Sequence, residues 1–363
     1  MPTSDRTRSG AATRTLIAAR ILDGSGGTGP SPAWVTIAGG RIAAVGSGHP
    51  GGHPEDLGDE VLAPGFLDLQ INGFGDCDFA TATVDAVIDT VDRMSGAGVT
   101  GVLPTVCTAP LDAYPAILER LATVRRHRPG AVLGVHLEGP FLGGAPGAHP
   151  PADIRPVDRA FIDALVADPS RLVRLVTLAP EADPDRYAIR TLTAAGIRVA
   201  LGHSTASYED SLAAIDAGAV LATHLFNGMS PLHHRRPGLV GAALTDPRIV
   251  PTFISDGVHV HSAVVGMTLA LRPDAVLVSD AVRSDATRLP DGTLAGSDVA
   301  IPEAVARLVR SGTPLTRAVR CATGNPARVL GASERGRVVP GARADLLAID
   351  PATLSVRRVA SGG

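Results

Sequence analysis

Three side chains that bind metal ions well each close a short apolar run in this sequence. Glu138 ends one run, His203 ends a second and His224 ends a third. Such runs are typical of buried β-strands, and a carboxylate at the end of a buried strand is costly unless something binds it. One glutamate and two histidines suit zinc or a similar divalent ion, so the sequence predicts a metal site built from these residues.

Two further residues extend this set. His136 lies two positions before Glu138, so both side chains point to the same face of a strand, and we expect His136 to support the site rather than bind the ion. Asp280 closes another apolar run and is interpreted as a catalytic carboxylate. A lone histidine or aspartate at a strand end usually has a structural role. The repetition of this placement along the chain favours a shared site.

Composition narrows the functional classes. The chain has 363 residues, 45% of them hydrophobic, and its net charge of −3 gives no reason to expect nucleic acid as a partner. All 33 of its Lys and Arg residues are arginine, which excludes Schiff-base chemistry, a P-loop lysine and a carbamylated lysine between two metals. The 3 cysteines are far apart, so we expect a reducing, cytoplasmic location. No apolar run is long enough for a membrane span.

The elements that must bring these strand ends together alternate between strand and helix. Strands are predicted at 61–71, 101–106, 131–138, 172–180, 197–203, 220–226, 250–256 and 275–280. Helices are predicted at 84–97, 111–127, 158–167, 185–195, 208–217, 262–271, 301–311 and 314–330. This alternation favours an α/β fold, a (β/α)8 TIM-like barrel, whose active site lies at the carboxyl ends of the strands. An open doubly wound sheet is the alternative, but no Gly-rich phosphate loop follows the first strand.

Both chain ends show a different pattern. Residues 15–62 and 336–356 contain short apolar strands separated by Gly-rich turns. We predict that the two ends pair in one small β-sandwich domain, 15–62 plus 336–363. The remaining parts are a flexible N-terminal tail at 1–14 and, at 63–335, the (β/α)8 barrel with its predicted metal site.

A set of motifs, in order along the chain, resembles one known family. The motifs are Pro64-Gly-Phe-Leu-Asp-Leu-Gln-Ile-Asn-Gly, His136-Leu-Glu-Gly-Pro-Phe, Gly147-Ala-His149, Leu201-Gly-His-Ser, Thr223-His-Leu-Phe-Asn-Gly-Met, Arg235-Arg-Pro-Gly, Ser255-Asp-Gly-Val-His and Ser279-Asp-Ala. Together they are similar to the motifs of the N-acetylglucosamine-6-phosphate deacetylases, which belong to the amidohydrolase superfamily. The resemblance extends over nearly the whole chain and implies a barrel with a small β domain from both termini.

The resemblance implies roles for the residues at the strand ends. Glu138, His203 and His224 match the metal ligands of the family, and Asp280 matches its catalytic acid/base. The implied reaction is attack of a metal-activated water on the acetamide of N-acetylglucosamine 6-phosphate, with Asp280 as general base and then acid. The products are glucosamine 6-phosphate and acetate.

The resemblance also implies how substrate is held. His149, Asn227, Gly228 and His259 match positions that bind the sugar phosphate. Arg235 matches an arginine that contacts phosphate from the neighbouring subunit, which implies a homodimer.

The first strand bears on the number of metal ions. Many amidohydrolases carry His-x-His there, whereas this chain has Gln70 and Asn72, and neutral amides are poor ligands for a transition metal. We therefore expect one divalent ion per chain, with Gln70 and Asn72 near the bound water. Zinc is the first expectation, and Fe²⁺, Mn²⁺ and Co²⁺ are alternatives.

Departures from the family pattern keep other functions open. The segment after Asp280 is short, and its Arg283 and Arg288 are candidates for altering specificity. The alternatives are a deacetylase of another N-acetyl amino sugar, such as N-acetylgalactosamine 6-phosphate, and a catalytically silent sugar-binding barrel. A cyclic-amide hydrolase such as a dihydroorotase is a third alternative, which the missing lysine and the missing His-x-His oppose.

Overall fold

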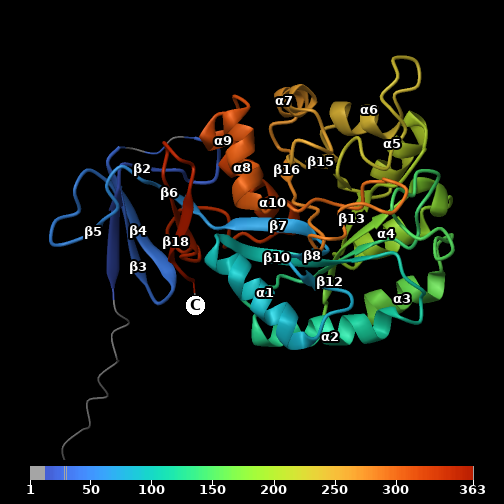
Figure 1. Ribbon diagram of the computed structural model, residues 1–363, viewed down its shortest axis with the longest axis horizontal. Coiled ribbons are helices and arrows are strands. Elements are labelled where there is room, and N and C mark those ends of the chain that lie inside the picture. The colour runs from blue at the N-terminus through green and yellow to red at the C-terminus, as the bar shows by residue number, and fades with distance from the viewer. Residues whose placement is uncertain (1–12, 28, 30, 363) are drawn as a thin grey trace, which may run out of the picture.

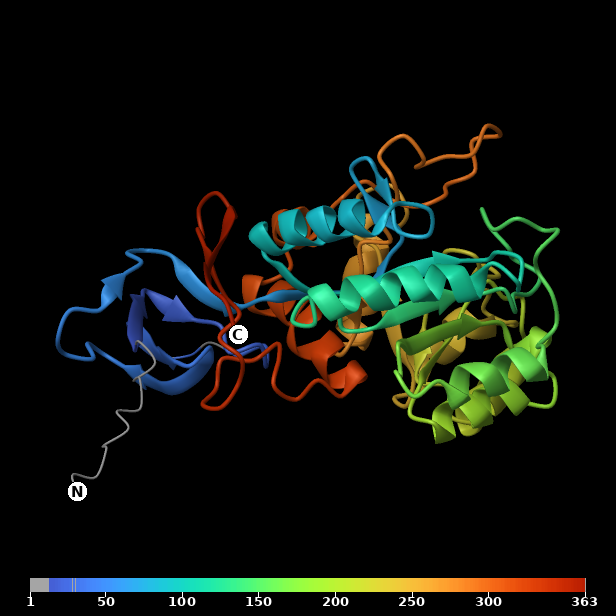
Figure 2. The same ribbon diagram turned by 90° about the horizontal axis from the view of Figure 1, so that it is seen from below.

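The computed structural model describes residues 13–27, 29 and 31–362, and it places a parallel barrel beside a small β domain (Figure 1, Figure 2). Residues 1–12 of the predicted tail lie outside the described residues. None of the helices in the described part of the chain is long and apolar enough to cross a membrane.

The barrel sheet has eight parallel strands whose spatial order follows the chain. They are β7 (Phe66–Ile71), β10 (Val99–Cys107), β11 (Val135–Glu138), β12 (Val173–Leu178), β13 (Arg198–Leu201), β14 (Leu221–Ala222), β15 (Val250–Phe253) and β16 (Val276–Leu277). The sheet closes where the Asp280 N–H donates to Gln70 O at 2.9 Å and Ile71 bridges Ala281. The predicted (β/α)8 barrel is therefore confirmed.

Helices connect the strands and cover the outside of the sheet (Figure 1). They are α1 (Val84–Gly96), α2 (Tyr114–His127), α3 (Arg159–Ala167), α4 (Tyr187–Ala194), α5 (Tyr208–Asp216), α6 (Gly238–Thr245), α7 (Ser262–Leu271), α8 (Ile301–Arg310), α9 (Leu315–Cys321), α10 (Gly324–Leu330) and the 3-10 turn at Pro180–Ala182. Sequence periodicity does not predict α6, because its residues are buried on all sides except Thr245. The helix predicted at 314–330 is two helices, since Pro326 in a continuous helix would clash with the carbonyl of Ala322.

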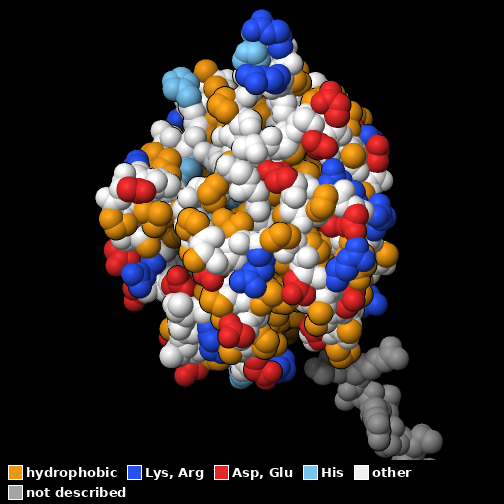
Figure 3. All heavy atoms as spheres, turned by 90° about the vertical axis from the view of Figure 1, so that its right-hand side faces the viewer, with side chains coloured by type: hydrophobic (Ala, Val, Ile, Leu, Met, Phe, Trp, Pro, Cys, Tyr) orange, Lys and Arg blue, Asp and Glu red, His pale blue; other side chains and the backbone are white. Residues whose placement is uncertain are grey.

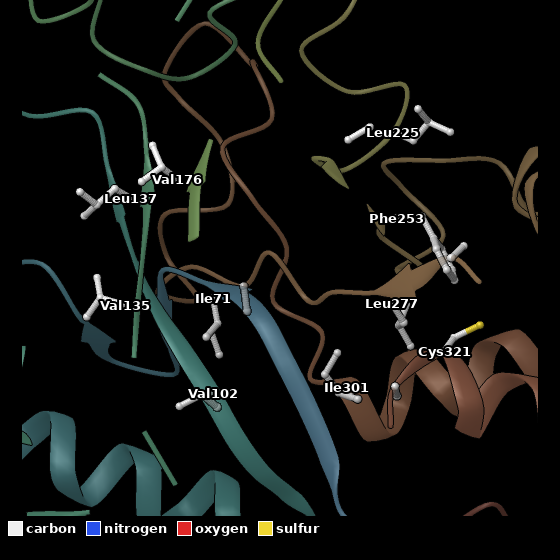
Figure 4. Close-up of a cluster of buried hydrophobic side chains, with 14 of the residues drawn as sticks. Ile71, Val102, Val135, Leu137, Val176, Leu225, Phe253, Leu277, Ile301 and Cys321 are labelled. Carbon is white, nitrogen blue, oxygen red and sulfur yellow. The ribbon is translucent and has the colours of Figure 1, made fainter. Parts of the chain in front are cut away.

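In the barrel, the apolar side chains of the described residues form two layers of core, separate from the core of the small β domain. The layer between strands and helices includes Val135 and Leu137 of β11 together with Ile301 of α8 and Cys321 of α9 (Figure 4). The second layer joins strand side chains to α10 and includes Leu69, Leu103, Leu175, Leu221, Val250, Val329 and Leu330. Each fully buried Val or Leu side chain stabilises the fold by about 1.5–3 kcal/mol relative to exposure. This packing fixes the strands whose carboxyl ends carry the site.

Two four-stranded sheets form the small β domain. One contains β1 (Arg14–Ala18), β3 (Ala33–Ala38), β4 (Arg41–Ser47) and β5 (Glu55–Asp56), and the other contains β2 (Arg20–Ile21), β6 (Val61–Pro64), β17 (Leu346–Ile349) and β18 (Val356–Ala360). A short hairpin of β8 (Gly73–Phe74) and β9 (Cys77–Asp78) follows β7 in the chain. The predicted pairing of both chain ends is confirmed by the antiparallel ladder between β6 and β17. The strand expected to start at residue 336 does not form, and the first strand of the segment 336–356 is β17 at Leu346–Ile349.

Gly65 divides the strand predicted at 61–71 into two strands of different sheets. β6 belongs to the small domain and β7 to the barrel. The Gly65 N–H donates to Asp345 O at 2.8 Å, and a Cβ at Gly65 would lie 2.1 Å from Thr100 Oγ1. Only glycine fits this crossing, so the prediction of one continuous strand is wrong. The predicted domain boundaries remain predictions. Strand β6 runs across the boundary predicted between residues 62 and 63.

Asp68 on β7 is fully buried and makes stability depend on pH. Its Oδ1 accepts from the Gln70 N–H at 3.3 Å and the Ser279 N–H at 3.2 Å, while its Oδ2 has no partner among the described residues. Burial raises the pKa of Asp68 to about 7. The folded state therefore holds this proton more tightly than the unfolded chain, whose pKa is about 3.9. The stability that protonated Asp68 contributes to the folded state is fully present below about pH 4 and is lost as the pH rises through 7.

We expect Asp68→Asn to stabilise the protein more at pH 8 than at pH 5. The uncharged amide removes a buried charge at pH 8, and the shift of about three pKa units sets an upper limit of about 4 kcal/mol. Urea unfolding at both pH values measures this difference, with Asp216→Asn on the surface as the control. An equal effect of Asp68→Asn at both pH values would contradict the assignment.

Candidate active site

The predicted metal ligands meet at the carboxyl ends of β11, β13 and β14. Glu138 Oε1 lies 3.1 Å from His203 Nε2 and 2.9 Å from His224 Nε2. The two imidazole Nε2 atoms are 3.0 Å apart, and all three side chains are buried. The structure thus brings together all three residues that sequence analysis assigned to the ion.

The backbone at these strand ends has unusual geometry. His203, His224 and Asp280 have φ values of 51°, 29° and 47°, which lie in or near the left-handed region that few non-glycine residues adopt. Such strained residues persist only where the surroundings fix them, and they cluster at functional sites. Sequence patterns locate these residues at strand ends but give no sign of this strain.

The electrostatics of the three residues fit a cation. Burial alone would raise the pKa of Glu138, but hydrogen bonds from His203 and His224 outweigh it and hold that pKa well below its usual range. Glu138 is therefore an anion facing two imidazole nitrogens at short range. A carboxylate oxygen and two imidazole nitrogens form a donor set suited to a divalent transition metal. His203 Nδ1 lies 3.2 Å from Ala145 O, the kind of carbonyl contact that orients a ligating histidine.

Asp280 lies beside this cluster and is held by two amides of β7 and its end. Gln70 Nε2 donates to Glu138 Oε1 at 2.8 Å and to Asp280 Oδ1 at 3.1 Å, and Asn72 Nδ2 donates to Asp280 Oδ1 at 3.0 Å. Burial, followed by the charge of Glu138, raises the pKa of Asp280 to about 7. Gln70 and Asn72 therefore orient the two carboxylates, and a carboxyl whose pKa lies near neutrality suits proton transfer.

His149 presents a neutral imidazole to the cavity. Its Nδ1 accepts from the Thr108 N–H at 3.3 Å and lies 2.8 Å from Thr108 Oγ1. Burial and the charge of His203 lower the pKa of His149 to about 3, so the ring is neutral and carries its proton on Nε2. His149 is thus a hydrogen-bond donor toward the cavity.

Cys107 is a site residue that sequence analysis did not identify. Its Sγ lies 3.1 Å from Asn72 Oδ1 and 3.8 Å from Glu138 Oε2, and with Glu138 and His149 it forms a second group that resembles a ligand set. The proton on His149 Nε2 opposes metal binding there. Burial and the charges of Glu138 and Asp280 raise the pKa of the Cys107 thiol well above its usual range, which also opposes thiolate ligation.

A cavity of about 400 Å³ joins these residues. Its wall contains predicted residues and also Thr293–Gly296 from the segment between β16 and α8, which projects from the barrel (orange in Figure 2). Arg283 and Arg288 of this segment do not line the cavity; Arg283 pairs with Asp285 and Arg288 donates to Gly292 O. Sequence analysis identified the segment but selected its arginines, since charge is visible in a sequence and the turn that brings Thr293–Gly296 inward is not.

The remaining predicted residues divide into three groups. Asn227, Gly228 and His259 line the cavity, and a Cβ at Gly228 would lie 2.7 Å from His203 Nδ1. His136 is buried behind the cluster, with Nε2 2.8 Å from Thr177 Oγ1. Arg235 lies outside the cavity, on the exposed loop that follows the β14 region.

The comparisons with known proteins agree with this geometry. A model of the amidohydrolase family matches residues 61–361. The chain is 37% identical over 318 residues to N-acetylgalactosamine-6-phosphate deacetylase of Escherichia coli O157:H7, covering 80% of this chain and 84% of the relative. It is 37% identical over 334 residues to N-acetylglucosamine-6-phosphate deacetylase of Mus musculus, covering 81% of each.

Solved structures give the same result. A mutant N-acetyl-D-glucosamine-6-phosphate deacetylase from Mycobacterium smegmatis, in complex with N-acetyl-D-glucosamine-6-phosphate, is 33% identical with a TM-score of 0.90, over 97% of this chain and 98% of the other. The Pasteurella multocida N-acetylglucosamine-6-phosphate deacetylase is 27% identical with a TM-score of 0.90, over 97% and 99%. The chain therefore belongs to the amidohydrolase family, and its sequence places it among the amino-sugar-phosphate deacetylases of that family.

Proposed function

We propose that this protein hydrolyses the acetamide of N-acetylglucosamine 6-phosphate and releases glucosamine 6-phosphate and acetate. The observation that carries this proposal is the placement of Asp280 in one cavity with Glu138, His203 and His224. The similarity to N-acetylglucosamine-6-phosphate deacetylases, one of them solved with that sugar phosphate, supports the choice of substrate. A silent sugar-binding barrel would not need a carboxyl tuned toward neutrality beside intact ligands.

Each residue of the site then has a task. Glu138, His203 and His224 would hold a divalent ion, which would supply Lewis-acid activation of water and of the carbonyl. Asp280 takes the proton of the attacking water and hands it to the nitrogen of the leaving amine. His149 donates its Nε2–H to the oxygen on which negative charge develops.

The number and identity of the ions follow from the ligands. Two nitrogens and one carboxylate oxygen favour zinc, with Fe²⁺, Mn²⁺ and Co²⁺ as alternatives. We propose one ion per chain, because Gln70 and Asn72 occupy the positions where a second ion would need histidines and both amides are already engaged with Glu138 and Asp280.

The three cysteines are free thiols, which supports a cytoplasmic location.

We also propose a homodimer in which Arg235 completes the site of the neighbouring subunit. The loop 230–237 is largely exposed. Figure 3 shows basic and histidine side chains gathered on a projection at the top of the molecule in that view. Within the described part of the chain, the hydrogen bonds of Arg235 join it to its neighbours His233 and His234. We expect Arg235→Gln to raise KM for the phosphorylated sugar without changing KM for N-acetylglucosamine. Light scattering on the unaltered protein tests the dimer itself, and a monomeric, fully active enzyme would contradict it.

Acetate release tests the proposed function. Metal-loaded protein is given N-acetylglucosamine 6-phosphate, N-acetylgalactosamine 6-phosphate or unphosphorylated N-acetylglucosamine, and kcat/KM is compared. We expect the first to give the highest value. Preference for the galactosamine compound would reassign the substrate within the same reaction, and no release from any of them would favour the binding barrel.

Asp256 offers a prediction about how the site holds sugar. Its Oδ2 lies 2.5 Å from His259 Nδ1 and its Oδ1 accepts the backbone N–H groups of Val258 and His259. Burial alone would raise the pKa of Asp256, but the hydrogen bonds from His259 lower it to about 2, so it is charged and fixes Nδ1–H on the ring. We expect Asp256→Asn to lower kcat/KM by about 10–100-fold, chiefly through KM, since the loss of such supporting partners has this size.

Asp246→Asn provides the matched control for Asp256, because Asp246 also pairs with a basic side chain, Arg248, but lies outside the cavity. Steady-state kinetics on both variants give the comparison. An unchanged KM in Asp256→Asn would show that the orientation of His259 does not depend on this carboxylate.

A further inference from the structure

A second cavity lies at the amino-terminal end of the barrel, away from the proposed active site. It has a volume of about 450 Å³ and lies where α9, α10 and the segment 331–337 meet the loop at Gly24 and Ser25 of the small domain. Asn325 of α10 fixes this region to the barrel, because its Nδ2 donates to Ala275 O at 2.8 Å just before β16 begins.

Among the described residues, four arginines line this cavity and no carboxylate does. They are Arg320, Arg328, Arg335 and Arg337, and the other lining residues are small or polar and uncharged. In a chain with a net charge of −3, this concentration of guanidinium groups around one cavity is not explained by overall composition. It gives the cavity a positive potential.

Two of the four charges have carboxylate partners outside the cavity wall. Arg335 is buried, lies 3.2 Å from Asp345 and donates to Gly130 O at 2.7 Å. Arg328 reaches Asp274 only at 3.8 Å, and Asp274 is already paired with Arg272 at 2.8 Å. Asp345 also pairs with Arg343 at 3.0 Å and with Arg358 at 3.3 Å, so Arg335 and Arg328 are both only partly neutralised.

The other two charges lack carboxylate partners within the described part of the chain. Arg320 Nε donates to the neutral Asn325 Oδ1 at 3.0 Å, and its stem packs against Gly26, where a Cβ would lie 2.8 Å from Arg320 Cδ. Arg337 makes neither a hydrogen bond nor an ion pair with any described residue. One guanidinium is therefore held in place and another is free to close on a ligand.

We propose that this cavity binds a small phosphorylated metabolite, with its phosphate between Arg320 and Arg337. Arginine is the residue best suited to phosphate, because its planar guanidinium makes paired, charge-assisted hydrogen bonds to phosphate oxygens. The volume lies in the range of small-molecule sites and leaves room beyond a single phosphate group. The small residues Gly24, Ala327 and Ala332 in the cavity wall leave space for the part of the ligand beyond its phosphate.

Calorimetric titration of the metal-loaded protein with inorganic phosphate and with ribose 5-phosphate tests the proposal. We expect a binding event that Arg337→Gln weakens by about tenfold or more and that Arg320→Gln/Arg337→Gln abolishes, with ribose 5-phosphate the tighter ligand. Arg310→Gln, an exposed arginine paired with Glu303 on α8, is the matched control and should bind like the unaltered protein.

The location of binding needs a second measurement, because the active site also takes a phosphorylated ligand under the proposed function. Crystals soaked in ribose 5-phosphate should show the phosphate between Arg320 and Arg337, and His259→Ala should keep this binding event. Arg337 is exposed and has no partner among the residues that the structure describes, so Arg337→Gln is expected to fold normally. Equal phosphate binding by the unaltered protein and the double variant, or phosphate found only in the active-site cavity, would overturn the proposal.

Discussion

Asp280→Asn is expected to lower kcat for acetate release from N-acetylglucosamine 6-phosphate by about 10³-fold while leaving metal content unchanged. Asparagine keeps the shape of the side chain and an oxygen that accepts from Gln70 and Asn72, but it takes no proton from water. General acid–base catalysis contributes about 10²–10⁴-fold. Asp280 is assigned both the first and the second proton transfer, so the upper half of that range is expected.

Asp285→Asn is the matched control, since Asp285 belongs to the same segment, pairs with Arg283 and lies outside the cavity. It should keep nearly full activity. Metal analysis and thermal unfolding of both variants separate a chemical defect from loss of the ion or of the fold. Should Asp280→Asn retain more than a tenth of the original kcat, with one metal ion per chain, another group must move the proton.

The barrel, and the strand ends that carry the candidate site, could be predicted because strong local patterns encode them. Buried parallel strands are apolar throughout, so a polar residue that ends such a run, such as Glu138 or His224, is conspicuous. Parallel topology then places all strand ends at one edge. The distances of about 3 Å among the ligands follow from the closing of the sheet, which no single segment encodes.

Other parts of the site depend on tertiary contacts that leave little local signal. Cys107 is an ordinary small apolar residue in the sequence, and only the approach of Asn72 makes it part of the site. Thr293–Gly296 reach the cavity because the segment after Asp280 folds back, with Val282 N–H donating to Ser297 O at 2.9 Å. The crossing at Gly65 depends on Thr100, which lies on a different strand. In each case the information lies in a partner distant in sequence.

Glu138→Gln is expected to remove metal binding and, with it, activity. Glu138 is the anionic member of the ligand set, and its Oε1 contacts the Nε2 atoms of both His203 and His224. Even the loss of groups that support a ligand costs 10–100-fold in metal affinity, so the loss of the charged ligand should exceed about a hundredfold. Elemental analysis after dialysis should give about one ion per chain in the unaltered protein and almost none in the variant.

Ligand-linked stability distinguishes loss of the ion from loss of the fold. Zinc at about 100 times its Kd should raise the free energy of unfolding of the unaltered protein by about 2.7 kcal/mol and leave that of Glu138→Gln unchanged. Glu303→Gln, a surface change on α8, should respond like the unaltered protein. Removing the ion from the unaltered protein with a chelator should reproduce the inactivity of the variant, and returning zinc should restore it. If the Glu138→Gln protein still held one ion per chain, the metal site would lie elsewhere in the protein. The group of Cys107, Glu138 and His149 could not be that site, because it contains the same glutamate.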